Sequence, residues 1–99
     1  MSATVTLFGS VGPSELAQIV TAHWLSFPPN PSGQSVFHRE EDQAAKVARE
    51  ATGGGFVVRF EVRAEKVGNG EGLTVRPEDL DAFNAAIVGG IHLIAEYAG

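Results

Sequence analysis

The clearest pattern in the chain is an alternation of apolar and polar positions over residues 56–64. The apolar positions, which share one face of an extended strand, are Phe56, Val58, Phe60, Val62 and Ala64. Three of the positions between them, Arg59, Glu61 and Arg63, are charged. Because side chains point alternately to the two faces of a strand, this pattern predicts a strand with one buried face and one nearly polar face.

Three other segments have the apolar period and the first turn of a helix. The first helix is predicted over residues 13–25, with His23 on its apolar stripe as a hydrogen-bonded core residue. The second begins with an acidic first turn at residues 40–42 and buries mostly small side chains. The third is predicted over residues 77–87, and the glycines at 89 and 90 end it.

Four shorter segments read as further strands. They are residues 4–8, 35–38, 73–75 and 91–97. Asn69-Gly70 favours a tight reversal, so residues 73–75 are expected to pair back on the long strand. Residues 91–97 are apolar on both faces apart from His92 and Glu96, which predicts a central strand.

The resulting order, β-α-β-α-β-β-α-β, predicts an α+β domain with about three helices and small mixed or antiparallel sheets. The chain has 99 residues, and area scaling lets a chain of this size bury roughly 64% of its surface. That is enough for one core and too little for two. We therefore predict a single domain over residues 1–99.

Composition and charge exclude several classes of function. The chain has no cysteine, so disulfides, zinc-thiolate sites and thiol nucleophiles are excluded. Residues 77–99 hold four acidic residues and no Lys or Arg, and the formal net charge is −5, so nucleic acid is not an expected partner. No apolar stretch approaches the roughly 20 residues that span a bilayer, so we expect a cytoplasmic protein without membrane contact.

Few residues stand out as candidates for chemistry. The three histidines lie on separate elements, and His92 and Glu96, roughly 13 Å apart on one strand face, cannot chelate a metal by themselves. Arg59 belongs either to a solvated face or to an anion contact. His38 is either a loop residue or a ligand contact. Glu71 lies among glycines, where its carboxylate is either a solvated group in a turn or a functional group.

Six stretches of the chain can be compared with a known family: Thr6-Leu7-Phe8, Val11-Gly12-Pro13-Ser14-Glu15-Leu16, Phe27-Pro28-Pro29, Val36-Phe37-His38, Phe56-Val57-Val58-Arg59-Phe60-Glu61-Val62 and residues 77–89. They resemble a group of small bacterial proteins related to ADP-ribosylation. Those proteins look like minimal versions of the ADP-ribosyltransferase fold. The resemblance implies that NAD sits in a cleft between two small sheets.

The resemblance also implies where NAD would be held. An Arg or His is expected near the end of the first strand, and this chain has Phe8-Gly9-Ser10 there. On the second strand, Ser35 and His38 match the positions near the nicotinamide. A Glu is expected just ahead of Leu73; that position is Gly72, and Glu71 comes one residue earlier.

Two hypotheses of different classes follow. In the first, the domain binds NAD or an ADP-ribose-like nucleotide through Phe8, Ser10, Ser35, His38 and Arg59, with Glu71 as the catalytic carboxylate if it is a mono-ADP-ribosyltransferase. In the second, it is a non-enzymatic module that binds a protein partner or forms a homodimer. The missing cation and the glycine at position 72 motivate the second hypothesis.

Overall fold

The computed structural model describes residues 3–29, 35–51, 54–67 and 72–97. Its strands are β1 (Thr4–Val11), β2 (Ser35–His38), β3 (Gly55–Arg63), β4 (Gly72–Val75) and β5 (Ile87–Tyr97). Its helices are α1 (Pro13–Thr21), α2 (Glu41–Glu50) and α3 (Leu80–Ala85), with short 3-10 turns η1 (Ala64–Lys66) and η2 (Pro77–Asp79). The predicted element order and the α+β class are confirmed.

All five described strands form one antiparallel sheet in the order β4-β2-β1-β3-β5. The prediction of more than one sheet is wrong for the described part of the chain. The expected pairing of residues 73–75 with the long strand is also wrong, because β3 is flanked by β1 and β5 and β4 pairs with β2 instead. Asn69 and Gly70, where the reversal was expected, lie outside the described residues.

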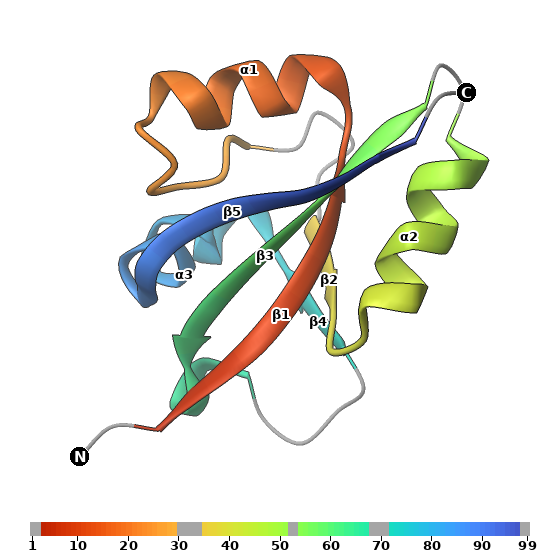
Figure 1. The fold of residues 1–99 in the computed structure, drawn as a ribbon. Helices are drawn as coiled ribbons and strands as arrows, with labels where there is room; N and C mark the ends of the chain where they lie inside the picture. Colours follow the sequence, from red (N-terminus) through yellow and green to blue (C-terminus); the bar gives the residue numbers. More distant parts are fainter. Residues whose placement is uncertain (1–2, 30–34, 52–53, 68–71, 98–99) are drawn as a thin grey trace.

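The helices cover the two faces of this sheet unequally. Figure 1 shows α1 and α3 on one side of the strands and α2 alone on the other. We call these the core face and the α2 face. The alternation in β3 has the predicted effect, because Val58, Phe60 and Val62 are fully buried on the core face. No described helix is long and apolar enough to cross a membrane.

Four phenylalanines form the centre of the core. The ring of Phe60 lies 4.8 Å from Phe27, 5.1 Å from Phe37 and 5.8 Å from Phe83, measured between centroids. Phe27 belongs to the segment after α1, and the side chain of Asn84 on α3 holds its backbone. Asn84 accepts a hydrogen bond from the Phe27 N–H at 2.9 Å and donates one to its carbonyl at 3.0 Å.

Helix α1 is shorter than predicted, because the chain turns after Thr21. His23 and Trp24 both adopt left-handed backbone conformations, with φ of 60° and 62°. His23 is therefore exposed rather than part of the core, which corrects its predicted role. The turn brings the Trp24 carbonyl to β5, where it accepts a hydrogen bond from the Ile91 N–H at 2.7 Å.

Strand β5 departs most from expectation. It begins at Ile87, so the glycines at 89 and 90 lie within a strand instead of ending a helix, with φ of 78° and 85°. It is an edge strand rather than a central one. Its apolar residues are spread over both faces because one part packs on the core and another on α2.

Register shifts in β5 also correct the expected placement of His92 and Glu96. His92 lies opposite Arg59, whereas Glu96 lies opposite Phe56, and a shift occurs between Val57 and Val58 of β3. Arg59 and Phe56 point to opposite faces, since they are an odd number of residues apart in one strand. His92 and Glu96 therefore do not share a face.

Candidate functional site

Helix α2 covers only part of the α2 face. Its alanines pack on Val57, with Phe8, Ala95 and Tyr97 at the border of this small cluster. The approach is close, since a Cβ at Gly55 would lie 3.2 Å from the Ala48 Cα. Beyond this contact, the polar side chains of β1, β3 and β5 are left open to solvent, among them Thr6, Arg59, Glu61 and His92.

The strand register aligns five positions in one row across the whole sheet. Phe8 lies opposite His38 on one side and Arg59 on the other. The row continues from His38 to Gly72 on β4 and from Arg59 to His92 on β5. We call these five residues the transverse row. Because directly paired residues share a face, the four side chains of the row all lie on the α2 face.

The row changes character along its length. Phe8 and His38 are partly buried, and Phe8 packs against the α2 cluster. Arg59 and His92 are exposed at the other end. The row thus combines an aromatic surface beside an imidazole with a guanidinium beside a second imidazole, which is a suitable combination for a ligand that carries both a ring and a negative charge.

A hollow of about 220 Å³ adjoins the exposed end of the row. It is lined by Thr6, Arg59, Phe60, Glu61, Val88, Gly89, Gly90 and His92, and we call it the bulge hollow. Its wall on β5 is the bulge, because Val88 lies opposite Glu61 and Ile91 opposite Phe60, which leaves Gly89 and Gly90 without partners on β3. The bulge widens the strand locally and opens the hollow.

The Arg59 side chain has no polar partner among the described residues, and it also lacks a ring contact such as that of Arg49, which lies 5.6 Å from the centroid of the Tyr97 ring. It makes no hydrogen bond or ion pair with the residues that the structure describes. By contrast, Arg63 forms an ion pair with Glu65 at 3.4 Å. The nearby carboxylate of Glu61 instead accepts a hydrogen bond from the Thr4 hydroxyl at 3.2 Å. The Arg59 guanidinium is therefore free to bind an anion.

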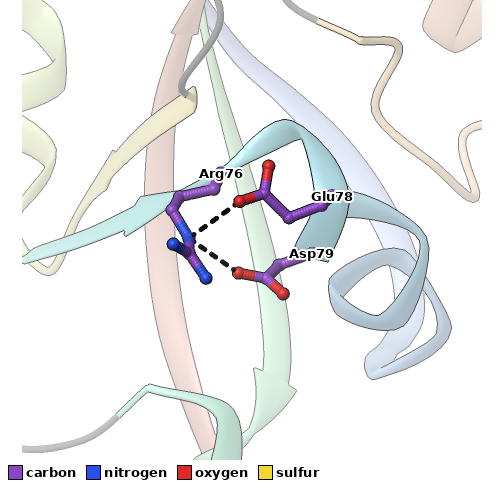
Figure 2. A network of polar contacts seen from close by, with 3 residues as sticks. All are labelled: Arg76, Glu78 and Asp79. Atoms are coloured by element: carbon purple, nitrogen blue, oxygen red, sulfur yellow. Dashed lines mark hydrogen bonds and ion pairs between the residues drawn. The ribbon is translucent and has the colours of Figure 1, made fainter.

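Arg76 shows what a committed arginine looks like in this protein. Its Nε lies 3.2 Å from a Glu78 oxygen and 3.3 Å from an Asp79 oxygen, at the corner between β4 and α3 (Figure 2). All three side chains are well exposed, so these ion pairs contribute little to stability. The two carboxylates neutralise the charge of Arg76 locally. Arg59, which has no such ion pair among the described residues, is therefore the better candidate for binding an anion.

The predicted site residues are placed as follows. Phe8, His38 and Arg59, which lie far apart in the sequence, are brought together in the transverse row. Ser10 and Ser35 are not in the row; they line a hollow of only about 30 Å³ near the start of α1. Glu71 lies outside the described residues.

Sequence reasoning missed His92, Thr6 and the glycine pair as parts of the site. A glycine pair between the strand-like residues Ile87-Val88 and Ile91 is a recognised signal for a bulge, and it was available in the sequence. Nothing in the sequence placed His92 opposite Arg59, because that alignment depends on the pairing of β3 with β5.

Two other hollows offer less chemistry. One, of about 220 Å³, lies between β4 and α3 beside Leu73, Val75 and Phe83. The other, of about 510 Å³, is a shallow apolar surface along β5 formed largely by Trp24, Leu25 and Leu93. The expected protein partner or homodimer stays a prediction. Among the described residues, no three His, Asp or Glu side chains are placed to hold a metal ion.

The chain was compared with protein-family models and with curated proteins. No protein-family model matches the chain, and no curated protein matches it significantly. The transverse row and the bulge hollow are therefore the features that indicate a function.

Proposed function

We propose that this domain binds NAD or an ADP-ribose-like nucleotide along the transverse row and does not transfer ADP-ribose. The observation that carries the proposal is the alignment of Gly72, His38 and Phe8 on adjacent strands. Each comes from one of the three strand segments at which the resemblance to ADP-ribosyltransferases expects a functional residue: Phe8-Gly9-Ser10, Ser35 or His38, and the position just ahead of Leu73. Strand pairing that collects them in one row supports a shared ligand.

Binding without transfer follows from the residues that occupy the row. Transfer from NAD needs a carboxylate beside the positive charge that develops on the ribose carbon. The β4 position of the row is Gly72, which supplies no carboxylate. The other row residues are two histidines, an arginine and a phenylalanine, which can hold a ring and a phosphate but place no negative charge beside the ribose carbon.

Calorimetric titration of the whole chain with millimolar NAD tests this proposal. We expect saturable binding, weakened several-fold by His38→Ala because the imidazole contact is lost. Arg76→Gln serves as the control, since Arg76 lies outside the row and already contacts Glu78 and Asp79. Incubation with labelled NAD is expected to transfer no label.

Two results would contradict the proposal. Absence of heat at millimolar NAD removes nucleotide binding altogether. Label transfer that disappears in Glu71→Gln would instead show an active transferase whose carboxylate is Glu71, and the statement that the domain only binds would be wrong.

A further inference from the structure

We infer that the bulge hollow is an anion site that takes a pyrophosphate or phosphate group, with Arg59 and His92 as its binding side chains. For the nucleotide, this inference rests on the proposed function, because it assigns the phosphate end of that ligand to one end of the transverse row. The anion site itself can be tested with inorganic pyrophosphate alone.

The first support is the set of uncommitted donors around the hollow. Arg59, His92 and Thr6 all line it, and none of their side chains makes a hydrogen bond with the described residues. Arg59 and His92 are direct cross-strand partners on one face. Their side chains therefore leave neighbouring strands on the same face, and an arginine fork matches the geometry of phosphate oxygens.

The second support is the size and shape of the hollow. About 220 Å³ is smaller than the roughly 300 Å³ at which pockets for drug-sized ligands begin. The hollow therefore suits a phosphate group better than a whole nucleotide. A Cβ at Gly89 would meet nothing within 4 Å, so this side of the bulge is open to an incoming ligand.

The third support is the local charge. The chain carries a net charge of −5 with histidine counted as neutral, whereas the hollow carries one guanidinium, that of Arg59, against one carboxylate, that of Glu61, and so lacks this negative excess. That carboxylate is held by the Thr4 hydroxyl. Glu61 opposes the anion, and this gives a prediction of opposite sign: removing its charge strengthens binding, whereas removing the charge of Arg59 weakens it.

Trp24 provides the signal for the experiment. It is the only tryptophan in the chain, and it lines the apolar hollow that shares Gly89, Gly90 and His92 with the bulge hollow. Pyrophosphate is titrated at low ionic strength while tryptophan fluorescence is recorded, because screening by salt weakens contacts between exposed charges. The wild-type chain is expected to show a saturable change.

Three charge variants and a matched control define the result. Arg59→Gln and His92→Gln are each expected to weaken pyrophosphate binding, by about tenfold to a hundredfold for the arginine. Glu61→Gln is expected to tighten it a few-fold. Arg76→Gln removes the same charge as Arg59→Gln at a distant exposed site and is expected to bind like the wild type.

The outcomes separate this inference from the proposed function. Equal weakening by Arg59→Gln and Arg76→Gln, or no saturable change in the wild type, would overturn the anion site. NAD binding that is insensitive to Arg59→Gln overturns the assignment of the nucleotide's phosphate end to this site, while the proposed function survives. Pyrophosphate binding that depends on Arg59, without any NAD binding, supports the anion site and removes the proposed function.

Discussion

Phe60→Ala is expected to lower the free energy of unfolding by about 3–5 kcal/mol. Phe60 is 1% exposed and its ring contacts three other phenylalanines at the centre of the core. Truncation removes these contacts and leaves a cavity that the sheet cannot close. Since a domain of this size has about 5–15 kcal/mol of stability in total, the loss is a large part of it.

Urea unfolding followed by circular dichroism measures this loss. Val47→Ala is the control, because Val47 is 47% exposed on α2 and its truncation should change the stability by less than about 0.5 kcal/mol. If Phe60→Ala costs no more than Val47→Ala, the phenylalanine cluster is not the centre of the core.

Gly90→Ala is expected to cost about 1–3 kcal/mol of stability. Gly90 has a φ of 85°, which a side chain disfavours, and an added Cβ would lie 3.1 Å from the Trp24 carbonyl oxygen. That oxygen accepts the Ile91 N–H, so the substitution disturbs the contact between the turn after α1 and the edge of β5. Pyrophosphate binding should weaken as well, because the bulge forms a wall of the hollow.

Gly89→Ala is the matched control for this variant. Its φ of 78° imposes a similar conformational cost, but an added Cβ meets nothing within 4 Å. The difference in urea midpoint between the two variants therefore isolates the contact with Trp24. Equal midpoints would contradict the role given to that contact.

The fold was predictable where the pattern is local. The alternation in residues 56–64 depends only on the two faces of one strand, and β3 has the predicted buried face. The position of β4 was not predictable in this way, because it depends on β2 being free to pair while β3 is already flanked on both sides. Strand order is a property of the whole chain.

The predicted end of the first helix and the predicted start of the last strand were wrong for a different reason. The apolar stripe through His23 and Trp24 has the right period for a helix. The helix nevertheless ends earlier, and the Trp24 carbonyl accepts a hydrogen bond from the Ile91 N–H on β5. Likewise, Gly89 and Gly90 break a helix in most contexts, but here they form a bulge in β5. Local propensity was overridden by tertiary contacts in both cases.

The candidate site was likewise predictable only in part. Phe8, His38 and Arg59 could be selected as residue types, because an aromatic ring, an imidazole and a guanidinium suit a nucleotide. Their alignment could not be predicted, since it depends on the register of three strands. His92 completes the row only because the bulge in β5 sets its register against Arg59.

The most direct test of the central claim is a residue-resolved titration of the labelled chain with NAD, followed by amide chemical shifts in nuclear magnetic resonance spectra. We expect the largest changes at His38, Phe8, Arg59 and His92, which span four strands of the row. Changes confined to the hollow between β4 and α3, beside Leu73 and Phe83, or no changes at millimolar NAD, would contradict it.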